Sequence, residues 1–163
     1  MAVATRNKKW IIGASFAAGV LLAGSWLYVN ETHQAEIKIE RQLTLVGEWV
    51  HVDGICDGKA GAIRGLDITK DFLLVEDGQS KKINNMDIVP VIDMPGACQG
   101  FGDFQFDFKV VMNTNDLVEY MYAKTSDGTE LLKSSSGEYY FRFSPQFKQH
   151  YDSIVSANMP SEV

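Results

Sequence analysis

Two cysteines, Cys56 and Cys98, are the residues of this sequence with the clearest chemical role. Neither stands in a CxxC or CxxCH motif and neither has a histidine beside it, so their spacing fits no common metal site. In an oxidising compartment the two thiols of a small domain pair with each other, and we expect a structural disulfide between them. The chain-entropy model gives a loop of this size on the order of 4 kcal/mol of stabilisation.

The remaining candidates for chemistry do not form a catalytic motif. The three histidines, His33, His51 and His150, are widely separated in the sequence. Residues 53–58 faintly resemble a calcium loop but lack the alternating oxygen ligands and the closing glutamate. Residues 134–136 are three serines typical of a loop. We therefore predict that the protein is not an enzyme and uses no metal or cofactor.

An aromatic stripe is the third feature that could bind something. Large apolar residues alternate with polar ones through residues 101–112, which is typical of a strand with one buried face. The stripe comprises Phe104, Phe106 and Phe108, followed by Val110 and Met112, and Trp49 on an earlier strand joins it as a candidate. These side chains either fill the core or line a cavity for a small apolar or amphipathic ligand.

The charge distribution argues against nucleic acid as a direct partner. The chain has 15 Lys and Arg against 21 Asp and Glu. Residues 1–29 hold Arg6, Lys8 and Lys9 and no acid, so all 21 acidic residues lie from residue 30 onward. Phosphate backbones are bound by dense basic surfaces, which this acidic part does not offer.

Residues 10–29 are predicted to anchor the chain in a membrane, because they contain no ionisable side chain except Tyr28. A helix of that length spans roughly 30 Å, the thickness of the hydrocarbon core. Basic residues precede the run and Glu31 follows it, so the positive-inside rule leaves residues 1–9 in the cytoplasm. Cleavage of a signal peptide after Ser25 is the alternative. The full spanning length favours a retained anchor.

Small residues recur four apart within that apolar run, at Gly13 and Ala17 and at Gly19 and Ala23. Such spacing lets a second membrane helix approach closely, although small residues are also common in membrane spans. Because such residues occur on several sides of the predicted helix, we expect it to have a helix partner in the membrane.

Residues 30–42 are predicted to be a stalk, either helical or, because Ile37 and Ile39 alternate, a first strand. The outer domain at 43–163 follows a β pattern. We expect about eight antiparallel strands, at 43–52, 63–69, 72–76, 86–93, 101–112, 117–123, 129–133 and 138–143. Pro90 places its strand at an edge or a bulge. Ser144 and Pro145 begin a C-terminal helix. The predicted fold is a small antiparallel barrel, or otherwise a strongly curled sheet, with that helix.

The strand at 117–123 has apolar side chains on both faces, with Val118, Tyr120 and Tyr122 on one of them. A strand with one solvated face alternates polar with apolar residues, so the second face must be covered by the terminal helix or by another chain. Tyr120 and Tyr122 are our candidate contacts with a partner.

Residues 47–49, Gly-Glu-Trp, resemble the GxW motif of lipocalins, in which the tryptophan closes one end of the barrel beneath an arginine of the last strand. Arg142 stands at the matching place, so the resemblance implies a reduced lipocalin-like barrel. The layout as a whole resembles the inner-membrane co-regulators ToxS, VtrC, PsaF and MyfF. That resemblance implies a β-rich periplasmic domain paired with a membrane-bound transcription regulator.

The sequence therefore predicts a protein of the bacterial inner membrane, with its C-terminal domain in the periplasm. Its expected function is to bind, stabilise and modulate a membrane-bound transcription regulator as a heterodimer, and to help it sense an envelope signal or apolar ligand. The alternative is a stand-alone lipocalin-like binder, anchored or secreted, of a small apolar ligand.

Overall fold

The computed structural model describes residues 31–158, so the predicted tail at 1–9 and membrane segment at 10–29, with Gly13, Ala17, Gly19 and Ala23, lie outside the described residues. The chain divides into two compact units between Arg41 and Gln42. Residues 31–45 are helical, which settles the stalk in favour of the helical alternative. Among residues 31–158, no helix combines the length and apolar character that crossing a membrane requires.

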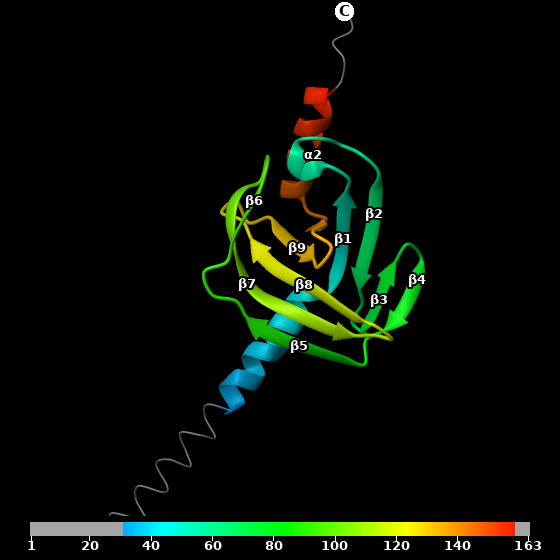
Figure 1. Cartoon of the computed structure of the whole chain (residues 1–163), viewed down its shortest axis with the longest axis vertical. Helices are drawn as coiled ribbons and strands as arrows, with labels where there is room; N and C mark the ends of the chain where they lie inside the picture. The colour runs from blue at the N-terminus through cyan, green and yellow to red at the C-terminus, as the bar shows by residue number, and fades with distance from the viewer. Residues whose placement is uncertain (1–30, 159–163) are drawn as a thin grey trace, which may run out of the picture. The chain divides into compact units, whose positions relative to one another are not determined.

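The second unit is mainly β, with one antiparallel sheet that curls round on itself and a helix at the C-terminus (Figure 1). Its order is β4-β3-β2-β1-β10-β9-β8-β7-β5, and β6 pairs with the other half of β7. The strands are β1 (Gly47–Val52), β2 (Ile63–Ile68), β3 (Leu73–Glu76), β4 (Gln79–Lys82), β5 (Asn85–Pro90), β6 (Pro95–Cys98), β7 (Gly102–Asn113), β8 (Leu117–Lys124), β9 (Glu130–Ser134) and β10 (Tyr139–Arg142).

The structure has two strands more than the eight that the pattern predicts, and both are edge strands. The residues of β4 are all polar, so it carries no apolar signal, yet it completes a hairpin with β3. The sequence of β6 contains Pro95 and Gly96, which weaken a strand but are tolerated at an edge. Pro90 also lies on an edge strand, β5, as predicted.

The sheet is a half-barrel rather than the closed barrel that we expected. Its two end strands, β4 and β5, are consecutive in the chain but do not pair with each other. Two residues join them: Ile83 donates to the carbonyl of Phe72 beside β3, and Asn84 donates to the carbonyl of Asn113 at the end of β7. The chain therefore crosses the gap at one end, and the buried Ile83 side chain fills it there.

A β-bulge on β7 divides the core into two parts. Phe106 pairs with Ala123 and Phe108 pairs with Tyr122, so the register shifts between the two phenylalanines. Consecutive residues of β8 project to opposite faces of the sheet, and cross-strand partners share a face. Phe106 and Phe108 consequently lie on opposite faces of the sheet. The prediction of one continuous buried face, drawn from the alternation in the sequence, is therefore wrong between these two residues.

The two core clusters follow these two faces. Inside the curl, the cluster draws on strands from both ends of the sheet and contains Leu45, Trp49, Leu66, Ile68, Leu74, Ile83, Met86, Phe108, Val110, Met112, Tyr120, Tyr122, Leu132 and Tyr140. The cluster on the outer face contains Val52, Ile55, Cys98, Phe101, Phe104, Phe106, Ala123, Leu131, Phe141, Phe147 and Ile154.

The outer cluster is covered by α2 (Pro145–Asn158), which contributes Phe147 and Ile154. This helix begins as predicted, because the Ser144 hydroxyl accepts a hydrogen bond of 3.1 Å from the backbone N–H of Phe147. The terminal helix, one of the two coverings proposed for the second face of β8, is the one observed. The two apolar faces of that strand therefore give no evidence for another chain.

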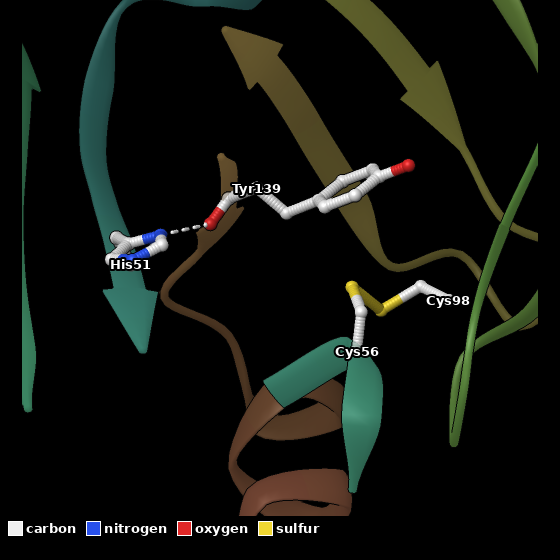
Figure 2. Close-up of a disulfide and its surroundings, with 4 residues drawn as sticks. All are labelled: His51, Cys56, Cys98 and Tyr139. Carbon is white, nitrogen blue, oxygen red and sulfur yellow. Dashed lines mark hydrogen bonds between the residues drawn. A yellow bond between two sulfur atoms is a disulfide. The ribbon is translucent and has the colours of Figure 1, made fainter. Parts of the chain in front are cut away.

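The predicted disulfide between Cys56 and Cys98 is confirmed (Figure 2). It joins the 3-10 turn η1 (Ile55–Asp57), which lies between β1 and β2, to the end of β6. The carbonyl of Cys56 also accepts a hydrogen bond of 3.2 Å from the backbone of Gln99. Because β6 pairs only with β7, the disulfide is a main attachment of this short edge strand to the rest of the domain.

We predict that Cys56→Ser lowers the free energy of unfolding by about 2–5 kcal/mol, as loss of a native disulfide from a small domain does. Urea denaturation of the oxidised protein measures the change. Cys98→Ser and the double variant should lower the free energy of unfolding by the same amount, since each removes the same cross-link. Two reactive thiols in the denatured, unreduced wild-type protein would contradict the pairing.

Candidate functional site

Trp49 and Arg142 form the contact between the first and last strands of the sheet. They are direct partners in the register of β1 and β10, and the guanidinium carbon lies 4.2 Å from the centroid of the indole ring. Trp49 is buried. This is the arrangement that the resemblance to lipocalins implies for these two residues.

The Arg142 guanidinium also caps the end of the helix at residues 31–45. It donates to the backbone carbonyls of Val46, at 3.0 Å, and of Thr44, and it pairs with the Glu130 carboxylate on β9. The indole N–H of Trp49 donates to the carbonyl of Leu45 at 3.0 Å. Carbonyls at a helix C-terminus lack partners within the helix, so these donors satisfy groups that would otherwise be unpaired.

The aromatic residues proposed as a ligand or core stripe do not line one cavity. Trp49 and Phe108 belong to the cluster inside the curl, whereas Phe104 and Phe106 belong to the outer cluster. Inside the curl, Phe108 stacks on Tyr122 with ring centroids 4.8 Å apart, and Trp49 meets Tyr122 edge to face at 6.5 Å. All four residues of the proposed stripe are therefore core residues. The concave face of the sheet is occupied by the protein's own aromatic rings.

Tyr120 and Tyr122, our candidate partner contacts, are buried and do not face a partner. They project into the curl because they pair with Val110 and Phe108. Burial raises the pKa of both phenols, and neighbouring carboxylates add to the effect. The prediction of partner contacts is wrong because both faces of β8 are apolar, so the sequence pattern alone does not show which face turns inward.

A polar cluster around His51 was not predicted. His51 is buried on β1, and its Nδ1 lies 2.8 Å from the carbonyl oxygen of Tyr139 (Figure 2). Its Nε2 lies 2.8 Å from the Asp53 carboxylate. Both partners are acceptors, so the doubly protonated ring donates to both, whereas a neutral ring donates to only one. The signal available in the sequence was the two-residue spacing of His51 and Asp53, which places them on one face of a strand.

Arg64 connects this cluster to Glu138, the residue before β10: it donates to Glu138 at 2.6 Å and to Asp53 at 3.4 Å. On β10 itself, the Tyr140 hydroxyl donates to Glu76 at 3.2 Å. The hydrogen bond from Arg64 lowers the pKa of Glu138, against the opposing effect of burial. The hydrogen bond from His51 likewise lowers the pKa of Asp53.

The His51 cluster holds neighbouring segments of the sheet together. Both ring nitrogens of His51 have partners within the protein. In the part of the chain that the structure describes, no group of three or more His, Cys, Asp or Glu side chains is placed to hold a metal ion. The cluster bridges the β1–β2 loop and β10, close to the disulfide.

No protein-family model, curated protein or solved structure matches this chain. The function is therefore inferred from the geometry of the β domain and from the sequence.

We predict that Arg142→Lys lowers the free energy of unfolding by about 1–3 kcal/mol, because one ammonium group cannot stack on Trp49 and also reach the helix carbonyls and Glu130. Urea denaturation followed by circular dichroism measures this loss. Arg64→Lys is the matched control, since Arg64 makes partly exposed ion pairs that contribute less than about 1 kcal/mol. Equal losses in the two variants would contradict a special role for Arg142.

We predict that Glu138→Gln reduces stability by about 1 kcal/mol at pH 7 and that this difference disappears in acid. The lowered pKa means that the fold favours the ionised carboxylate, so its contribution is present above the ordinary value of 4.5 and is lost as the pH falls through the folded-state value. Urea midpoints across this acid range give the test. A constant difference at every pH would show that Arg64 does not act through the charge of Glu138.

Proposed function

We propose that this protein is a membrane-anchored partner subunit that binds, stabilises and modulates a membrane-bound transcription regulator. In this proposal residues 10–29 anchor it in the bacterial inner membrane, and the β domain lies in the periplasm as a reduced, lipocalin-like half-barrel. The acidic domain does not bind DNA itself, so its effect on transcription passes through the regulator.

The observation that carries the proposal is that the concave face of the sheet is packed with the protein's own side chains, while each end strand of the sheet, β4 and β5, pairs with a neighbouring strand on one side only. Trp49, Phe108, Tyr120, Tyr122 and Tyr140 together occupy the space where a small barrel would hold a ligand. Close packing and a ligand cavity compete for the same volume, so a filled core favours a protein partner over a bound small molecule.

The open end strands support binding to another protein by surface contact rather than by added strands. β4 is short and carries Lys81 and Lys82, and β5 carries Pro90, which has no N–H to donate. The carbonyl of Met86 on β5 already accepts a hydrogen bond of 3.2 Å from the Gln42 side chain. Charged residues and proline are the means by which proteins keep sheet edges from pairing.

A stand-alone lipocalin-like binder of an apolar ligand is the second candidate, and the contact between Trp49 and Arg142 favours it. This contact is what the lipocalin resemblance implies for one end of such a barrel. A ligand would then have to displace aromatic side chains from the curl.

We predict that a regulator encoded beside this protein is degraded several-fold faster in cells that lack the full-length chain, because exposed apolar surface marks an unpartnered domain for proteolysis. A pulse-chase of the regulator measures its half-life, and an unrelated single-span membrane protein serves as the control. An unchanged half-life, together with saturable quenching of tryptophan fluorescence by a fatty acid, would establish the binder instead.

A further inference from the structure

The edge formed by β5 and β6 carries an apolar tip that neither the core nor the proposed anchor explains. Val89, Ile92 and Met94, which we call the tip, have 49%, 82% and 42% of their surface exposed. Single exposed apolar residues are ordinary on protein surfaces, but three within six positions form a patch, and such patches mark contact sites.

The backbone of the tip is hydrogen-bonded to β7 at two points. The N–H of Val91 donates to the carbonyl of Asp107 at 3.2 Å, and the carbonyl of Met94 accepts from the N–H of Phe106 at 3.0 Å. Ile92 and Asp93 are looped out between these two anchors, and Asp93 takes a left-handed backbone conformation with φ of 51°. A segment whose backbone is held before binding loses less conformational entropy on contact, which favours its use as a contact site.

An open groove of about 690 Å³ begins next to the tip, where β6 follows Met94. Its lining comprises Pro95, Gly96, Ala97, Asp103, Phe104 and Gln105. Gly96 brings the backbone against an aromatic ring, since a Cβ added there would lie 2.3 Å from Cε2 of Phe104. The protruding tip and the groove are therefore parts of one surface that a single segment could contact.

Carboxylates lie along this surface. Three exposed aspartates belong to it: Asp93 is in the loop of the tip, Asp103 lines the groove, and Asp107 accepts the backbone hydrogen bond from Val91. Lys109 is opposite Val89 in the register, and its ammonium group lies 2.7 Å from the Glu119 carboxylate. The surface consequently presents an apolar centre with a negative rim, which attracts basic groups and repels anionic lipid headgroups.

We infer that the tip and the adjoining groove dock a protein segment that carries apolar side chains flanked by lysine or arginine. The inference rests on the proposed function, because it names the surface through which the chain would contact its regulator. Charge complementarity sets the kind of partner: an acidic segment or an anionic membrane would meet the aspartates at close range.

The test uses the full-length chain in phosphatidylcholine nanodiscs and short fluorescent peptides of alternating leucine and lysine, leucine and glutamate, or leucine and serine. The leucine–lysine peptide should bind best by fluorescence anisotropy. Ile92→Asp should weaken that binding by roughly tenfold, as truncation of an anchor residue does. The double variant Asp93→Asn and Asp103→Asn should weaken it several-fold and keep the backbone conformation, because asparagine tolerates the left-handed region.

Leu117→Asp is the matched control, since Leu117 is 71% exposed at the start of β8, where it pairs with Asn113 at the far end of β7. Equal binding of the leucine–glutamate peptide, or an equal loss in Leu117→Asp, would overturn the inference. Binding to phosphatidylglycerol vesicles that depends on Ile92 would assign the tip to lipid and overturn it as well. If Ile92→Asp still protects the regulator in the pulse-chase, the docking surface is wrong but the proposed function stands. If Ile92→Asp weakens peptide binding but loss of the chain leaves the half-life of the regulator unchanged, the docking surface stands and the proposed function is wrong.

Discussion

The domain depends on the pairing of its first strand with its last, and the contact of Arg142 with Trp49 fixes that pairing. One guanidinium group covers the indole, holds Glu130 on β9 and satisfies two carbonyls at the end of the helix that leads into β1. The planar fork of arginine can do this, whereas a single ammonium group cannot. Residues 42–46, which connect the stalk to the sheet, are thereby fixed by the β domain itself.

Because β1 and β10 are joined in this way, the gap in the half-barrel falls between β4 and β5 in the middle of the chain. The second consequence is that the sheet needs a cover on its outer face, and the chain leaving β10 supplies it directly as α2. The disulfide and the His51 cluster then tie the β1–β2 loop to β6 and β10 on the same side.

The sequence allowed most of the strands, the disulfide and the start of α2 to be predicted, because each depends on local pattern or on residue type. The contact between Trp49 and Arg142 was implied only by the resemblance to lipocalins. The bulge between Phe106 and Phe108 could not be predicted, since an extra residue leaves the alternation of apolar and polar letters intact while it reverses the face. The burial of Tyr120 and Tyr122 could not be predicted either, because both faces of β8 carry apolar residues and the pattern does not show which face turns inward. β4 and β6 carry no apolar signal, and the His51 cluster joins residues that are far apart in the chain.

The packing of the interior bears most directly on function. A barrel that takes up a ligand needs unfilled space inside, but here the rings of Trp49, Phe108 and Tyr122 contact one another across the concave face. Opening that space would separate aromatic pairs whose burial stabilises a small domain, at a cost of several kcal/mol. The surfaces that can be contacted without such a cost lie at the sheet edges. Among these edges, the tip beside β6 presents exposed apolar side chains next to an open groove.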